Sequence, residues 1–194
     1  MNEIIDKVSK TLIKAASVFR EDQKVAYYHA INAEDNKNTK WALSQILDNA
    51  LVAETSCSHL CDDTGIPHLF LEVGPNKEFS GALMKDIHLG VEKGLRALPG
   101  RPMAIDGNDR QRIDQSGGLN PDPGALLPAP ILIKPIDEDV LRLTVLMLGG
   151  GPAIRGITHR IFHKHSVSVV VDEIVERSKE AVAKLGCSPC TLAI

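Results

Sequence analysis

Four cysteines form two closely spaced pairs that could bind a metal. Three residues separate Cys57 from Cys61, and two separate Cys187 from Cys190. Each pair follows a predicted helix, so four thiolates could converge on one ion if the two helix ends meet. Four sulfur ligands suit zinc or an iron–sulfur cluster, and their order does not separate the two. Free cysteines also pack as small apolar residues, so burial without a metal stays open.

Two carboxylates follow the first pair directly. Asp62 and Asp63 come after Cys61, and Thr64 and Gly65 complete the run. A carboxylate beside a cationic centre is suited to moving a proton as a general acid or base. The same residue types are typical of ordinary turns. The residues alone therefore leave both interpretations open.

Glycines and arginines elsewhere could contact an anionic ligand. The run 149–151 is Gly-Gly-Gly at the end of a predicted strand, where backbone amides could approach a carboxylate or phosphate. Arg101, Arg110 and Arg112 flank a long loop and could clamp a dicarboxylate, because guanidinium binds carboxylates through paired hydrogen bonds. A plain turn and solvent-facing arginines are the alternatives.

Apolar spacing predicts the elements that must hold these residues. Steps of three and four residues predict helices over 2–19, 39–55 and 81–98, with Asn38 and Ser80 as N-caps, and a further helix is predicted over 21–33. Residues 167–171 have strand composition whereas 172–185 have helical spacing, so most of 167–185 is predicted to be helical. Strands are predicted over 68–73, 131–136 and 140–148, the last two joined as a hairpin. The buried stripe of the third helix is expected at Trp41, Ile46, Leu47, Ala50 and Leu51.

Two segments between these elements carry further candidates. Residues 99–130 are rich in Gly, Pro, Asp and Asn and are predicted to form a long loop, a kind of segment that is commonly functional. A helical turn or two is expected after Pro152 through Phe162. On a helix, His159 and His163 would share a face, a geometry that zinc can use, although surface histidines are the simpler interpretation.

The elements predict a mixed α/β fold, with an N-terminal helical cluster packed on a small sheet and residues 1–194 forming a single domain. A hydrophobic content of 43% is ample for a core. A net charge of -3, from 22 basic and 25 acidic residues, argues against a nucleic-acid or membrane partner. The N-terminus carries charges in place of a signal peptide, so we expect a cytoplasmic protein.

Three motifs, taken in order, resemble the landmarks of a known family. They are Cys61-Asp62-Asp63-Thr64-Gly65, the glycine run 149–151 and Cys187-Ser188-Pro189. The iron–sulfur hydro-lyases, namely class I fumarate hydratase and the alpha subunit of L(+)-tartrate dehydratase, carry a similar Cys-Gln-Asp-Thr-Gly motif, a glycine-rich strand end and a Cys-Pro-Pro-like motif. The resemblance covers most of the chain, and its first motif is the specific one.

The resemblance implies a 4Fe-4S cluster held by three cysteines. Cys61 and Cys187 stand at matching ligand positions, and the family's third cysteine lies beyond the second. Asp63 matches the motif's aspartate, which implies an acid/base or substrate-orienting role. The iron of such a cluster acts as a Lewis acid that helps hydroxide leave while a base takes the proton from the neighbouring carbon.

The resemblance also implies contacts to a small dicarboxylic or hydroxy acid. Asp62 stands where most relatives have glutamine, so a donor amide has become a carboxylate at an implied substrate-binding position. Arg101 roughly matches a substrate-binding arginine, and Gly150 or Gly151 would give backbone contacts. The implied reaction is reversible hydration of fumarate to malate or dehydration of tartrate to oxaloacetate.

Because the chain stops at Ile194, we expect the N-terminal portion of the alpha region, incomplete at its C-terminus and inactive alone. The rest of the alpha region or a beta subunit would complete it in a homo- or hetero-oligomer. Two alternatives come from other classes of function. One is a structural zinc module that uses Cys57, Cys61, Cys187 and Cys190, and the other is a partner-binding fragment without metal.

Overall fold

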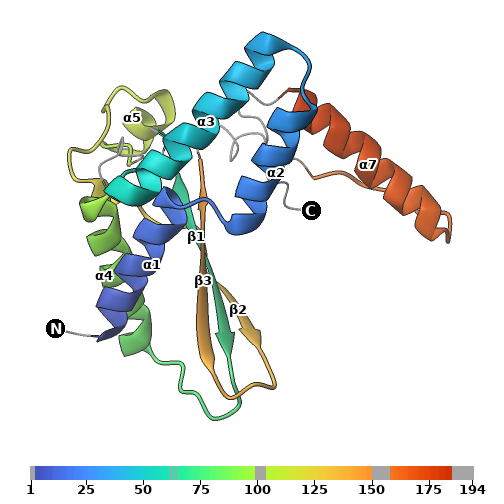
Figure 1. Cartoon of the computed structure of the whole chain (residues 1–194). Helices are drawn as coiled ribbons and strands as arrows, with labels where there is room; N and C mark the ends of the chain where they lie inside the picture. The colour runs from blue at the N-terminus through green and yellow to red at the C-terminus, as the bar shows by residue number, and fades with distance from the viewer. Residues whose placement is uncertain (1–2, 62, 64, 99–103, 150–157, 185–194) are drawn as a thin grey trace. The chain divides into compact units, whose positions relative to one another are not determined.

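The computed structural model describes residues 3–61, 63, 65–98, 104–149 and 158–184 and divides the chain into two compact units, Met1–Gly150 and Gly151–Ile194. The first unit contains α1 (Glu3–Ser17), α2 (Glu21–Ala33), α3 (Lys37–Ser56), β1 (Ile66–Val73), α4 (Gly81–Ala97), α5 (Asp109–Asp114), the 3-10 helix η1 (Pro123–Ala125), β2 (Leu132–Pro135) and β3 (Leu141–Leu148). The second contains α7 (Val167–Ala183) (Figure 1). The mixed α/β class is confirmed.

The three strands form one sheet in the order β2-β1-β3, so the predicted hairpin of the last two strands is wrong. Strand β1 lies between them, parallel to β2 and antiparallel to β3. The link from β2 to β3 crosses the end of β1, where Ile136 donates its amide to Val73 and Gly74 donates to Val140. A β-carbon on Gly74 would overlap the carbonyl oxygen of Glu138, so the crossing needs glycine at this position.

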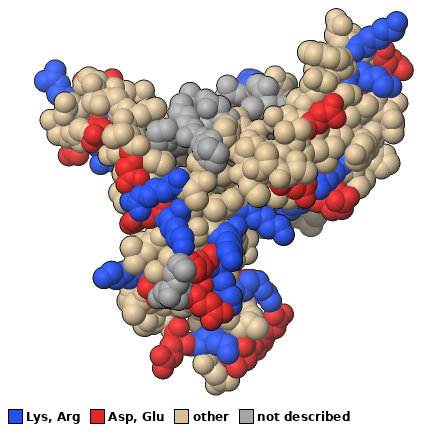
Figure 2. All heavy atoms as spheres, turned by 60° about the vertical axis from the view of Figure 1, so that its left-hand side comes forward, with Lys and Arg blue, Asp and Glu red and all other residues tan. Residues whose placement is uncertain are grey.

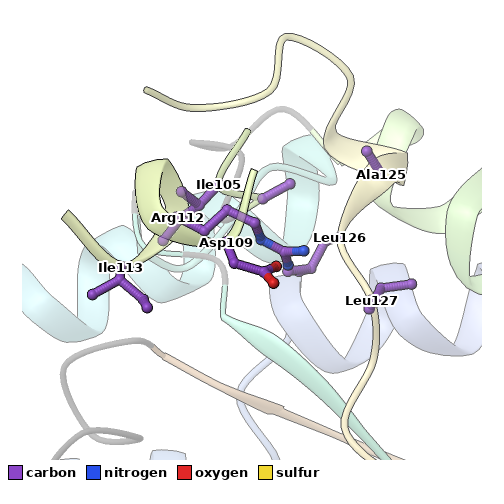
Figure 3. A pocket seen from close by; sticks show the side chains of 8 residues that line it. Ile105, Asp109, Arg112, Ile113, Ala125, Leu126 and Leu127 are labelled. Atoms are coloured by element: carbon purple, nitrogen blue, oxygen red, sulfur yellow. The ribbon is translucent and has the colours of Figure 1, made fainter. Parts of the chain in front are cut away.

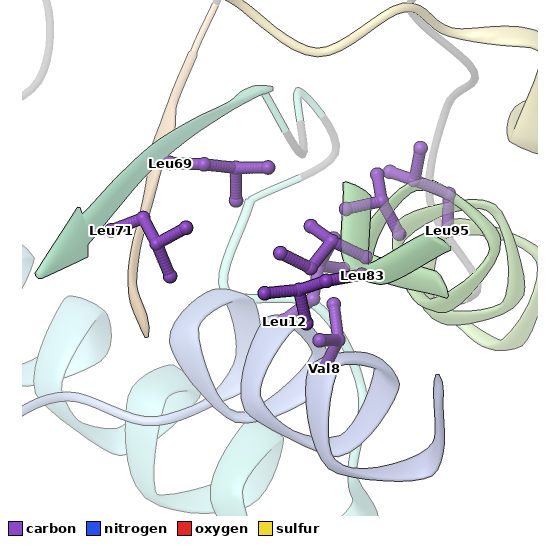
Figure 4. Close-up of a cluster of buried hydrophobic side chains, with 8 residues drawn as sticks. Val8, Leu12, Leu69, Leu71, Leu83 and Leu95 are labelled. Carbon is purple, nitrogen blue, oxygen red and sulfur yellow. The ribbon is translucent and has the colours of Figure 1, made fainter. Parts of the chain in front are cut away.

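The core lies between one face of the sheet and the pair of helices α1 and α4 (Figures 1 and 4). Alternation along β1 buries Leu69 and Leu71 against the helices, whereas Phe70 is exposed. This packing confirms the expected helical cluster on a small sheet. The buried cluster consists of Val8, Leu12, Leu69, Leu71, Leu83, Ile87, Val91 and Leu95.

Two glycines let α4 approach α1 closely. A β-carbon on Gly90 would lie 2.6 Å from Cβ of Val8, and one on Gly94 would lie 3.2 Å from Cβ of Leu12. Near the start of α1, Lys93 donates to Asp6 across the same contact at 2.6 Å. The glycine pair therefore shapes the seam between the two helices that cover the sheet.

Helices α2 and α3 pack against each other, and the start of α3 differs from the prediction. Asn36 is its N-cap and accepts the amides of Asn38 and Thr39, so Asn38 is a donor rather than the cap. The buried stripe is narrower than predicted. It keeps Leu47 and Ala50 and adds Ala53, whereas Ile46 and Leu51 are exposed and Trp41 is 67% exposed.

Helix α4 begins as predicted, because the hydroxyl of Ser80 accepts the amide of Leu83. The predicted loop 99–130 is not structureless, since its described part contains α5 and η1. Helix α7 confirms the helix predicted for most of 167–185 as far as Ala183, and residue 185 lies outside the described part. The helical turns expected up to Phe162 are wrong for residues 158–162, and residues 152–157 lie outside the described part.

Acidic and basic side chains lie next to one another in several places on the surface shown in Figure 2. At the end of the sheet, Arg142 pairs with Glu72 on β1, and it also pairs with Glu138 in the crossing link. Such pairing is consistent with the nearly balanced charge of the sequence. Among the described helices, none combines the length and apolar character that crossing a bilayer requires.

Candidate functional site

Cys61 and Asp63 lie in the short loop between α3 and β1. Cys57 ends α3 in a left-handed conformation, with φ at 52°, and its amide donates to Ala53. Further along the loop, the amide of Leu60 donates to the carbonyl of Ala16 at 3.0 Å, which ties the loop to the end of α1. The side chain of Asn49 donates to the carbonyl of Leu60 at 3.1 Å. These bonds fix the backbone that leads into the cysteine–aspartate motif.

The last residue of the motif touches the glycine-rich strand end. Gly65 has φ at 93°, a region that residues with a β-carbon rarely adopt. A β-carbon here would lie 2.7 Å from the carbonyl carbon of Leu148 and 2.9 Å from the amide nitrogen of Gly149. The fold therefore brings together two motifs that lie more than eighty residues apart in sequence. Both features of Gly65, its conformation and its packing, exclude a side chain.

Two polar atoms of this loop are shielded from solvent. The Oδ1 atom of Asp63 is buried in a side chain that is otherwise only half-buried. The Nδ1 atom of His59 is also buried, and it has no hydrogen-bond partner among the described residues. An unsatisfied buried polar atom costs roughly 1–3 kcal/mol. His59 could not be found from the sequence, because no spacing pattern distinguishes it from any other loop histidine.

The described cysteines are available as ligands. Cys57 and Cys61 are both exposed and neither forms a disulfide. A free, accessible thiol is the ligand type that iron–sulfur clusters and zinc use, so the chemistry of Cys61 fits the implied cofactor. Within the described part of the chain, no three His, Cys, Asp or Glu side chains gather closely enough to hold an ion. Cys187 and Cys190 lie outside the described residues.

Four more predicted site residues lie outside the described part of the chain. They are Asp62, Arg101, Gly150 and Gly151. In the sequence, Asp62 lies between Cys61 and Asp63, Gly150 and Gly151 follow Gly149, and Arg101 falls in the segment after α4.

A pocket of about 590 Å³ lies against the loop that follows α4 (Figure 3). Asp109 and Arg112 of α5 extend toward its centre, and Ile105 and Leu126 form part of its apolar wall. Arg112 thus lines a concave surface, as a ligand-binding arginine would, whereas Arg110 is exposed outside this lining. Asp109 beside it reduces the positive charge that Arg112 offers to an anion.

An ion pair anchors this loop on α4. Arg96 donates from Nε and from a terminal nitrogen to both carboxylate oxygens of Asp122, at 2.9 and 2.8 Å. Hydrogen bonding from Arg96 is the main cause that lowers the pKa of Asp122 below its usual value, and the amide of Gly124 contributes to the same effect. Since Asp122 also caps η1, one carboxylate holds both the helix and the loop.

The second unit does not provide the predicted histidine pair. Residues 158–163 are not helical, so His159 and His163 do not share a helix face. Instead, Nδ1 of His163 accepts the backbone amide of His165 at 2.9 Å, and the two rings meet edge to face. The local turn therefore gives Nδ1 of His163 a hydrogen-bond partner without a metal.

The mixed α/β fold and the order of the motifs along the chain agree with the family resemblance. Comparison with family models gives a match to fumarate hydratase (Fumerase) over residues 5–194. The chain therefore belongs to the fumarate hydratase family, which confirms the resemblance of the motifs.

The chain is also similar to a curated protein of Methanocaldococcus jannaschii that is provisionally named L(+)-tartrate dehydratase subunit alpha. The two are 32% identical over 120 residues, which cover 61% of this chain and 42% of that protein. The matched region is therefore less than half the length of the archaeal relative.

Proposed function

We propose that this chain is a component of an iron–sulfur hydro-lyase. The reaction is the reversible hydration of fumarate to malate or the dehydration of tartrate to oxaloacetate. Family membership over residues 5–194 and similarity to a tartrate dehydratase alpha subunit support a hydro-lyase. The observation that carries the proposal is the packing of Gly65 on Leu148 and Gly149, because it joins the cysteine–aspartate loop to the glycine-rich strand end.

Asp63 is the proposed acid/base. In the dehydration direction, its carboxylate takes a proton from the carbon next to the hydroxyl-bearing carbon, and in hydration it returns that proton. Its position in a tethered loop, with Oδ1 shielded from water, supports this role.

Cys61 and Cys187 are the proposed ligands of a 4Fe-4S cluster. When bound, the cluster supplies Lewis acidity, which helps the substrate hydroxyl leave as hydroxide. Asp62, Arg101 and the backbone of Gly150 or Gly151 are the proposed substrate contacts. Guanidinium and backbone amides are suited to the two carboxylates of such a substrate.

We also propose a partner and a compartment. The archaeal relative is named as an alpha subunit, which supports completion by a beta subunit or by a further region of the alpha component. Without that completion we expect no turnover. Two exposed free thiols suit the reducing cytoplasm, where iron–sulfur ligands stay unoxidised.

The test is an anaerobic analysis of iron, sulfide and zinc in the purified chain, with and without a coexpressed beta-type partner. We expect iron and sulfide in the completed protein, together with fumarate hydration or tartrate dehydration. Stoichiometric zinc in a colourless chain, bound through Cys57, Cys61, Cys187 and Cys190, would instead establish the structural zinc module. A chain that carries no metal in either preparation, and whose stability is unchanged by chelators, would contradict both proposals.

A further inference from the structure

His59 stands out in the α3–β1 loop because its environment satisfies the backbone but not the side chain. Less than 1 Å² of its Nδ1 atom is exposed, and this nitrogen has no hydrogen-bond partner among the described residues. On either side of it the backbone is bonded, since Ser58 donates to Ala53 and Leu60 donates to Ala16, both at 3.0 Å. The loop is thus held in place while a buried nitrogen is left unsatisfied.

The position of His59 connects this nitrogen with the candidate site. It lies two residues before Cys61 and four before Asp63, whose Oδ1 is shielded from solvent in the same loop. Buried polar atoms in folded proteins nearly always have a partner, so one without a partner calls for an explanation. A group that serves a ligand is one such explanation, because the partner is then absent from the unloaded protein.

We propose that His59 is a substrate-binding residue whose partner arrives with the dicarboxylate. With the hydrogen on Nδ1, the imidazole donates a hydrogen bond to one carboxylate of the bound acid. A bond from a neutral donor to an ionised acceptor is stronger than one between neutral groups. Because the nitrogen is covered in the unloaded chain and the backbone on either side is hydrogen-bonded, the His59 side chain turns when the acid binds.

The inference rests on the proposed function, since it takes a dicarboxylic acid as the ligand. It assigns to the α3–β1 loop a second substrate contact, besides the acid/base role of Asp63. It also predicts that His59 lowers the stability of the unloaded protein. A residue kept for packing alone would raise that stability.

Three substitutions at His59 distinguish the contributions of Nδ1, of Nε2 and of side-chain shape to binding. His59→Asn places an amide nitrogen close to the position of Nδ1, and His59→Leu keeps the branching of Asn without any donor. His59→Gln places its amide nitrogen near the position of Nε2 instead. Binding of fumarate and of L(+)-tartrate to the purified chain is measured by titration calorimetry, and thermal unfolding is measured without ligand.

We expect the Asn variant to bind within about threefold of the unsubstituted chain, whereas the Leu and Gln variants bind at least about tenfold more weakly, as loss of a bond to a charged group implies. The Leu variant should also melt about 2–4 °C higher, because it removes the unsatisfied nitrogen.

Equal binding by the Asn and Leu variants, or a lower melting temperature of the Leu variant, would overturn the inference. Failure of the unsubstituted chain to bind either acid would overturn it as well. The proposed function is judged separately, by turnover of the completed enzyme with its cluster. That turnover would stand if the His59 variants showed no effect, so the two failures are distinguishable.

Discussion

Gly65 and Leu148 approach so closely that a β-carbon on Gly65 would lie 2.7 Å from both the carbonyl carbon and the carbonyl oxygen of Leu148. The first residue of β1, Ile66, pairs with Leu148 in the antiparallel ladder. The contact is therefore part of the sheet itself, and the cysteine–aspartate loop enters the sheet beside the point where β3 leaves it. Any shift of that ladder would also move the loop that carries Asp63.

Replacement of Gly65 by alanine should be strongly destabilising. The left-handed backbone costs about 1 kcal/mol for a residue with a β-carbon, and the clash with Leu148 adds about 1–3 kcal/mol. Chemical denaturation should show the combined loss. Gly118→Ala is the matched control, because its φ is 73° but no atom lies within 4 Å of the added carbon. An equal loss in both variants would mean that backbone strain, and not the contact, is responsible.

Gly90→Ala should destabilise the first unit although alanine is the better helix former. The helix gains about 1 kcal/mol from alanine, but the added carbon would lie 2.6 Å from Cβ of Val8 and 2.9 Å from the carbonyl oxygen of Ile5. Forcing α1 and α4 apart should cost about 1–3 kcal/mol more than that gain. Gly81→Ala, in open space at the start of α4, is expected to be neutral or slightly stabilising. Equal unfolding midpoints for the two variants would contradict the close packing of α4 on α1 at Gly90.

The parts of the fold that could be predicted from sequence are those set by local periodicity. The helix capped by Ser80 is one example, since its hydroxyl accepts the amide that the cap rule assigns to it. The hairpin prediction failed because pairing depends on a strand sixty residues earlier. Strand β1 offers edges to both β2 and β3, and no local pattern reveals that. The capping-box residues Asn108 and Gln111 indicate the start of α5 in the sequence, but the prediction of one long loop did not include that helix.

Part of the candidate site could likewise be predicted from the sequence, and part depends on the fold. The family resemblance of the motifs pointed to Cys61, Asp63 and the glycine run, whereas only the fold shows that Gly65 lies against Gly149. His59 could not be predicted, because burial of one ring nitrogen depends on how a tethered loop packs. Trp41 shows the opposite error. Helical spacing assigned it to the core, but α3 is covered on a face that does not include it.

The Arg96–Asp122 pair should make part of the stability depend on pH. Hydrogen bonding from Arg96 lowers the pKa of Asp122 below 3.8, so its folded-state pKa is below the unfolded one. The contribution is therefore fully present above about pH 4 and is lost as the pH falls through the folded-state pKa. Asp122→Asn keeps an oxygen to cap η1, so the variant isolates the charge. The stability difference from the unsubstituted chain should shrink between pH 7 and pH 3, and also in high salt because the pair is exposed. A difference independent of pH would contradict the pKa argument.

Cys61→Ser should prevent stable cluster assembly, because a serine oxygen is a poor substitute for a thiolate on iron. Iron and sulfide are measured after anaerobic reconstitution of the completed enzyme. Cys57→Ser is the matched control, since Cys57 is equally free and exposed and lies four residues earlier in the same loop. We expect it to retain iron. Loss of metal in both variants, with zinc as the metal lost, would favour the structural zinc module, and undiminished iron in Cys61→Ser would exclude Cys61 as a ligand.

Asp63→Asn should remove turnover while leaving the cluster in place. The amide keeps the size of the side chain but cannot take up a proton, and loss of a general acid/base costs about 10² to 10⁴ in rate. Fumarate hydration is followed in the completed enzyme, alongside the iron content and visible absorbance of the same sample. Asp48→Asn, which changes an exposed carboxylate of α3 that has no proposed role, should leave the rate unaltered. A normal rate for Asp63→Asn with the cluster intact would show that Asp63 is not the acid/base. Loss of both the rate and the iron would show a structural role instead, because a base is not needed to assemble the cluster.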